Sequence, residues 1–272
     1  MVFQILIHQP MLPPFAALSS KSSRYNPSMA SNACKLLALT ALPLVAQWAN
    51  VPGGKVDLAA PTPRTRDRKP DLSGVWQTDL KYNTNLAADL PPDAVPMTLW
   101  GKALYDQRQA NNAKDDPEGY CYPPGVPRAS GVPFPEKIFQ TQEAIVILYE
   151  TRTMFRQIFL DGRAPVGDPQ PTWMGYSAGH WDGDVLVVQT TGFNDRTWLD
   201  DDGHPHSENM RVTERFRRPD MGHLVIEITI DDPKAYERPW TAIEVFQLLA
   251  GADLLEYVCN ENNLDPPHLV GK

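Results

Sequence analysis

The segment 192–216 carries the densest set of side chains that could transfer protons or bind a metal. It reads GFNDRTWLDDDGHPHSENMRVTERF, with His204 and His206 two positions apart and Glu208 after them. In an extended chain alternate side chains share a face, so these three groups and Glu214 would lie on one side, and the opposite side is polar throughout. We therefore expect the mixed face to line the wet mouth of a pocket and the basic face to meet water.

An acid–base site is the first interpretation of this segment. His206 would be the acid or base, with Glu208 and Asp195 as its orienting groups, because a neighbouring carboxylate raises the pKa of an imidazole and fixes its tautomer. Glu214 lies between apolar neighbours, which would raise its pKa as expected of a general acid. Arg156 alternates with apolar residues in its own strand, so we predict an inward Arg156–Glu214 pair.

Two other interpretations remain open. His204, His206 and Glu208 match the two-histidine, one-carboxylate pattern of zinc or non-haem iron sites, although a further element would have to complete the coordination sphere. Alternatively the segment is a hydrogen-bonded loop in which the histidines cap backbone groups and the aspartates at 200–202 form turns. No cofactor is expected beyond such a divalent ion.

Further side chains are candidates for contacts with a substrate. We expect these contacts from His204, Trp198, Tyr176, Trp173 and His180. Each has a structural alternative, since aromatic residues of a small barrel are more often core than ligand contacts. The sequence contains no G-x-S-x-G, Walker-type or G-x-G-x-x-G motif, which disfavours an elbow-type serine hydrolase and a nucleotide-binding protein.

Composition limits the class of protein. The chain has 272 residues, of which 42% are hydrophobic and 9% aromatic, enough for one sizeable core. Its net charge is −8 and no long basic run is present, so nucleic acid is not an expected partner. No apolar run reaches the roughly 20 residues that cross a bilayer, so no membrane span is expected after signal removal.

The N-terminal region has the features of an export signal. We interpret residues 1–49 as a leader whose signal starts at about Met29, with Lys35 before the apolar run LLALTALPLVA and cleavage near Ala46. An anchor that stays attached is the alternative. A Pro-rich linker at 50–70, a single domain at 71–265 and a tail at 266–272 would follow, in a secreted or periplasmic protein.

Export affects how the cysteines are interpreted. Cys34 would leave with the signal, and the remaining Cys121 and Cys259 form an even pair in an oxidising compartment. We predict one disulfide, which would tie the loop at 120–128 to the last strand. Two free buried thiols are the alternative.

The remaining pattern predicts a β protein. One strand is expected at 71–79, and an insertion at 82–136 with a helix at 98–110 follows it. Turn signals then recur about every ten residues and predict strands at 137–141, 144–150, 154–160, 173–181, 184–191, 206–218, 223–230, 240–249 and 254–259. Sequential hairpins favour an all-β, antiparallel up-and-down barrel, because closure removes free edges, and a two-sheet sandwich is the alternative.

Two resemblances accompany this pattern. Gly74-Val75-Trp76 on the first strand, followed by a meander, resembles the lipocalin-like (calycin) barrels, whose first strand carries G-x-W. This resemblance covers roughly 71–261 and implies a lumen for a small, largely apolar molecule. The insertion is longer than the family's first loop, and Arg238 is our candidate for the late arginine that packs over the Trp.

The strings DLSGVW, PTWMGYSAGHWDGD, TTGFNDRTWLD and GHPHSE also resemble those of a large group of exported, mostly uncharacterised microbial proteins. This second resemblance implies export and brings no activity with it, and fold alone does not fix function.

These observations lead to one expected function and two alternatives. We expect an exported enzyme that acts by proton transfer on a small, fairly hydrophobic molecule, as a lyase, dehydratase, isomerase or cyclase. The alternatives are a non-catalytic lipocalin-like carrier of a small apolar ligand and a metal-dependent enzyme at His204, His206 and Glu208. An enzyme needs His206 and a carboxylate within hydrogen-bond reach on a cavity wall, whereas a carrier needs only an apolar lumen.

Overall fold

The structure is a computed structural model, and it describes residues 56–163 and 169–261. These belong to the compact unit that begins at Ala46. Our expectations for the leader at 1–49, the first part of the linker and the tail at 266–272 lie outside the described residues. Among the helices within the described ranges, none is both long and apolar enough to cross a membrane.

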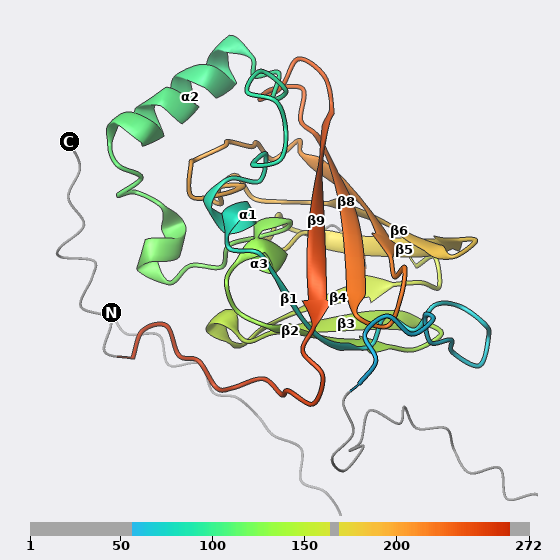
Figure 1. Cartoon of the computed structure of the whole chain (residues 1–272). Helices are drawn as coiled ribbons and strands as arrows, with labels where there is room; N and C mark the ends of the chain where they lie inside the picture. Colours follow the sequence, from blue (N-terminus) through green and yellow to red (C-terminus); the bar gives the residue numbers. More distant parts are fainter. Residues whose placement is uncertain (1–55, 164–168, 262–272) are drawn as a thin grey trace, which may run out of the picture. The chain divides into compact units, whose positions relative to one another are not determined.

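In the part of the chain that the structure describes, nine consecutive strands form a closed barrel (Figure 1). The expected all-β barrel is confirmed, and the sandwich is wrong because β1 pairs with both β2 and β9. The strands are β1 (Gly74–Thr78), β2 (Glu136–Gln140), β3 (Ala144–Tyr149), β4 (Met154–Phe159), β5 (Tyr176–Asp182), β6 (Val185–Thr191), β7 (Arg211–Arg217), β8 (His223–Asp231) and β9 (Trp240–Leu248).

One pair of neighbouring strands departs from the expected antiparallel order. β4 and β5 run parallel and are joined only through Ile158–Ser177 and Phe159–Ala178. The hairpin interpretation is wrong here because the connection over 160–175 is long enough to return the chain to the same end of the barrel. The first part of β4 therefore has no ladder partner in β5, and this is a short ladder within the closed barrel.

The insertion between β1 and β2 contains the helices α1 (Lys81–Thr84), α2 (Leu99–Ala110), η1 (Pro117–Tyr120) and α3 (Arg128–Gly131). The helix expected at 98–110 is confirmed, and the Thr98 hydroxyl caps it by accepting the Gly101 N–H at 3.1 Å. Gly101 permits close packing, since a Cβ there would lie 2.3 Å from the Ala235 carbonyl oxygen. Helix α2 therefore packs on the β8–β9 connection, outside the barrel (Figure 1).

Helix α3 lies against side chains of the barrel interior. All four of its residues are buried. The Ser130 hydroxyl is 3.4 Å from the Tyr149 hydroxyl, and a Cβ on Gly131 would lie 3.5 Å from a carboxyl oxygen of Glu244. This short helix therefore covers the polar part of the lumen.

Trp76 of the G-x-W motif is fully buried at the start of the barrel. Its indole N–H donates to the Leu72 carbonyl at 3.0 Å, and the Arg218 guanidinium lies 4.8 Å from its ring centre. Our candidate Arg238 is wrong, because it is exposed in the β8–β9 connection. A bridge between Pro61 and Asp220 holds the β7–β8 turn beside the segment that precedes β1, and this brings Arg218 to the ring.

The last expected strand, 254–259, is wrong: this segment is irregular and mostly exposed. Pairing of β1 with β9 closes the barrel, so no free edge remains for another strand. The predicted disulfide between Cys121 and Cys259 is confirmed. It joins the end of η1 to the segment after β9 and not to a strand of the barrel.

Candidate functional site

His204 and His206 lie in the loop before β7, although we had expected His206 to be the first residue of that strand. β7 begins only at Arg211, so the expected strand at 206–218 is too long. A turn closed by the Met210 N–H and the Ser207 carbonyl, 3.1 Å apart, interrupts the extended chain before β7. The predicted inward face holds only within β7, where Val212, Glu214 and Phe216 are buried.

His204 is 3% exposed and is bound to a carboxylate. Its Nδ1 donates to Asp200 at 2.5 Å, and the same carboxylate accepts the His204 N–H at 3.0 Å and the Leu86 N–H at 2.9 Å. The Tyr105 ring of α2 lies 4.8 Å from the imidazole. His204 therefore joins the loop before β7 to the insertion.

His206 is also buried, but no carboxylate contacts it among the described residues. Its Nδ1 is 3.2 Å from the Ser207 carbonyl and its Nε2 is 2.5 Å from the Thr197 hydroxyl. A carbonyl only accepts, so Nδ1 carries the proton and Nε2 accepts from Thr197. Burial lowers the pKa of His206, which favours the neutral ring. Both ring nitrogens are therefore already engaged.

Asp195 and Glu208 do not orient His206, although all three line one polar cavity of about 300 Å³. Both carboxylates are exposed. The metal interpretation fails geometrically, because His204 binds Asp200, His206 binds Thr197 and Glu208 faces solvent.

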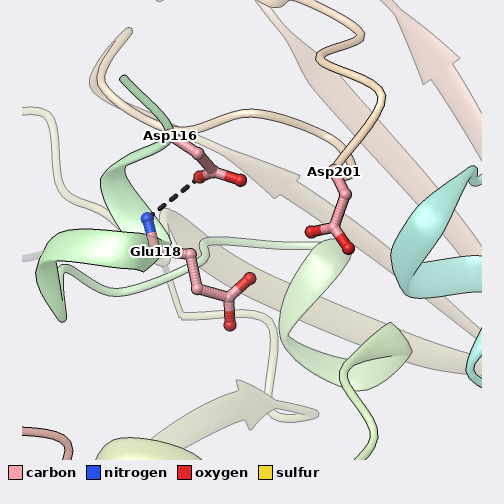
Figure 2. Close-up of side chains that lie close together, drawn as sticks. All are labelled: Asp116, Glu118 and Asp201. Carbon is pink, nitrogen blue, oxygen red and sulfur yellow. Dashed lines mark hydrogen bonds between the residues drawn. The ribbon is translucent and has the colours of Figure 1, made fainter. Parts of the chain in front are cut away.

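Three other acids do approach one another, namely Asp116, Glu118 and Asp201 (Figure 2). The buried guanidinium of Arg128 already binds all three, and Arg152 also pairs with Glu118. Arg128 donates to Asp116 at 2.7 and 2.9 Å, lies 2.8 Å from Glu118 and contacts Asp201. This cluster connects α3 to η1 and to the loop after β6. A metal ion bound between the three acids would be repelled by the positive charge of Arg128.

The Arg156–Glu214 pair predicted from strand alternation is present inside the barrel. The Arg156 guanidinium, from β4, makes two hydrogen bonds to the Glu214 carboxylate of β7, one of them at 3.0 Å. Arg156 also donates to Ser177 at 3.0 Å and to Thr190 at 2.9 Å. Four strands thus direct polar groups to one point, and Glu214 is already neutralised by its partner.

Two further carboxyl groups in the lumen were not predicted, Glu136 of β2 and Glu244 of β9. Both are fully buried, and none of their carboxyl oxygens has a well-formed hydrogen bond within the described chain. Burial raises the pKa of Glu136 from 4.5 to about 8, although the Ser130 hydroxyl and the Arg156 charge oppose the shift. Burial also raises the pKa of Glu244 well above 4.5. Burial therefore favours the protonated form of both groups.

An apolar crevice of about 570 Å³ opens at the β4–β5 seam. Its apolar lining comes mainly from Met154, Phe155, Phe159, Trp173, Met174 and Tyr176. Arg156 and Ser177 also line it, and the buried Arg156 side chain extends from this wall to Glu214 in the lumen.

Only part of the expected substrate-contact set gathers at this crevice. Trp173 and Tyr176 line it. Trp198 is buried beneath the Arg108 guanidinium, which lies 4.3 Å from its ring centre, and His180 points outward from β5 into solvent.

No protein-family model matches the chain, and no curated protein matches it either. The crevice and the polar groups behind it therefore carry the functional interpretation.

Proposed function

We propose that this protein is an enzyme that transfers protons to or from a small, largely apolar molecule bound in the β4–β5 crevice. One observation carries the proposal: three carboxyl groups and a single guanidinium occupy the barrel interior next to an apolar opening. Glu214 is paired to Arg156, and burial favours the protonated form of Glu136, whose pKa rises to about 8, and of Glu244. A carboxylic acid kept neutral near pH 7 is suited to general acid catalysis.

The proposal gives each group a role. The apolar part of the substrate packs on Trp173 and Met154, and its carbonyl or hydroxyl oxygen meets the Arg156 guanidinium at the inner end of the crevice. Glu136 supplies the proton. Tyr149 lies opposite Glu136 in the β2–β3 ladder and opposite Met154 in the β3–β4 ladder, so its side chain is on the same face of the sheet as the acid and Met154.

This arrangement suits a lyase, dehydratase, isomerase or cyclase, because each of these reactions gains or loses a proton at a carbon or an oxygen. The closed barrel and the buried Trp76 under Arg218 support the likeness to lipocalin-like proteins, whose lumen holds small apolar molecules. The Cys121–Cys259 disulfide supports export to an oxidising compartment.

A carrier of a small apolar ligand is the second candidate function, and the apolar lining of the crevice favours it. A carrier would use the crevice without using the acid, so the two functions differ in what Glu136 does.

The test uses the full chain in D₂O with a panel of small apolar ketones, enones and tertiary alcohols. Mass spectrometry follows solvent deuterium uptake and loss of water. We expect turnover of at least one compound, and Glu136→Gln should lower its rate by about 100-fold or more while the compound still binds. Glu208→Gln is the matched control, since Glu208 is exposed and lies outside the crevice.

Two results would contradict the proposal, the first its catalytic function and the second the role of Glu136. One is tight binding of panel compounds to the wild-type crevice with no exchange or water loss, which is the behaviour of a carrier. The other is an equal rate in wild type and Glu136→Gln, which would show that another group supplies the proton.

A further inference from the structure

A second cavity lies outside the barrel, between α2, the loop before β7 and the β8–β9 connection. It has a volume of about 300 Å³ and shares no lining residue with the β4–β5 crevice. Arg108 of α2 and Lys234 of the β8–β9 connection line it together with Asp195, Glu208 and the neutral His206. None of these residues takes part in the proton-transfer site proposed above.

Arg108 is the distinctive member of this cavity. It is partly buried, its Nη1 donates to the Gly203 carbonyl at 3.0 Å, and its guanidinium lies over the Trp198 ring. Within residues 56–163 and 169–261, no carboxylate forms an ion pair with it, whereas Arg128 and Arg156 each bind carboxylates. Burial lowers the pKa of Arg108 to about 10, because nearby acids do not compensate for the lost hydration.

The other nitrogens of Arg108 remain available to a ligand. Its Nε and Nη2 make no hydrogen bond to the described chain, yet they are not sealed from solvent. A guanidinium that is poorly hydrated and lacks an acidic partner favours a planar anion that accepts two parallel hydrogen bonds, and a carboxylate has that geometry.

The remaining charges match a ligand that carries both signs. Lys234, whose Nζ lies 4.6 Å from the Trp100 ring centre, adds a second cation to the wall. Asp195 and Glu208 add two carboxylates, and neither makes a side-chain hydrogen bond or ion pair with another described residue. Two cations and two anions leave the lining neutral, which disfavours a ligand with a large net charge.

We propose that this cavity binds a small zwitterion of the α-amino acid class, whose carboxylate pairs with Arg108 and whose ammonium group pairs with Asp195 and Glu208. The volume is at the lower end for small-molecule sites and suits a ligand of this size. The site is independent of the proton-transfer proposal, because the two cavities have separate linings.

This proposal can be tested by isothermal titration calorimetry, in which each of the standard amino acids is titrated into the full chain. We expect saturable binding of at least one amino acid. Its N-acetyl derivative, which lacks the ammonium group, and its amide, which lacks the carboxylate, should each bind at least about 10-fold more weakly, a loss of roughly 1.4 kcal/mol.

Two variants test recognition of the carboxylate and of the ammonium group separately. Arg108→Met should weaken binding of the amino acid and of its N-acetyl derivative, whereas Glu208→Gln should weaken only the amino acid. Glu208 is exposed, so its variant keeps the test decisive if Arg108→Met fails to fold. Glu237→Gln, an exposed acid outside the lining, is the matched control and should change nothing.

Absence of saturable binding up to about 10 mM ligand, a concentration that detects even millimolar affinity, would overturn the proposal. Equal affinity for an amino acid and its N-acetyl derivative would also overturn it, since the acids would then not recognise the ammonium group. Binding that survives both Arg108→Met and Glu208→Gln would place the ligand elsewhere.

Discussion

Glu136 should give the folded protein an unusual pH dependence of stability. Its pKa is about 8 in the folded state against an ordinary value of 4.5, so between these values the unfolded chain has released a proton that the folded chain keeps. The free energy of unfolding is therefore highest below pH 4.5 with respect to this group, falls as the pH rises toward 8, and then levels off.

Glu136→Gln should remove part of this slope, because glutamine keeps the shape and does not ionise. We expect the variant to be more stable than wild type at pH 8 by an amount on the order of a few kcal/mol, and the difference should shrink toward pH 5. Urea unfolding of both proteins at pH 5 and pH 8 measures this. If the unfolding free energies of the two proteins changed equally between pH 5 and pH 8, Glu136 would be ionised in the folded state. Glu208→Gln is the control and should show the pH dependence of wild type.

The residues in regular strands were more predictable than those in loops. Alternation placed Arg156 and Glu214 inside, and the same rule applied to Trp240, Ala242 and Glu244 would have found the third carboxyl group, because all three lie on one buried face of β9. Glu136 is the first residue of β2, so there is no preceding strand residue whose alternation would predict that its side chain points inward. The partners of His206 depend on the path of an irregular loop, which no short sequence period encodes.

At the scale of elements, the disulfide joins two segments that lie outside the sheet. The segment around Cys259 contacts the body through a few groups: the Leu255 N–H donates to Glu150 at 2.8 Å, and Thr153 donates to the Tyr257 carbonyl at 3.1 Å. Such a segment has little burial to keep it in place by itself.

Cys259→Ser should therefore release this segment and leave the barrel folded. Limited proteolysis should cut the variant after β9, at a site that is protected in the oxidised wild type, while its circular dichroism spectrum remains that of a β protein. We expect the loss in unfolding free energy to fall below the roughly 5 kcal/mol of the chain-entropy model, because the folded variant also gains freedom. Cooperative collapse of the whole barrel would contradict this expectation.

Strand positions were more predictable than strand order. Alternating apolar residues identified 144–150, 223–230 and 240–249 as strands, and each has a counterpart in the barrel. The parallel β4–β5 pair was not predictable from local pattern, because a turn signal after β4 does not show which end of the barrel the chain reaches next. The apolar run at 254–259 resembles a strand but has no edge to join.

At the scale of the whole molecule, closure of the barrel produces the candidate site. Glu136, Arg156, Ser177, Glu214 and Glu244 come from five strands between residues 136 and 248, and closure of the sheet turns them toward one interior. The same closure withdraws them from water, which favours the protonated form of Glu136 and Glu244. The short β4–β5 ladder then leaves an apolar crevice beside Arg156 and Ser177.

The same raised pKa should govern catalysis, but over a higher pH range than stability. If Glu136 donates the proton, kcat/KM for a panel substrate should fall as the pH rises through about 8, since only the neutral acid is active. Loss of folded protein would also lower the rate, so circular dichroism at each pH must show that the protein is still folded. A rate that stays constant to pH 9 in folded protein would exclude Glu136 as donor, whereas a rate that rises through this range would point to an ionised carboxylate acting as base.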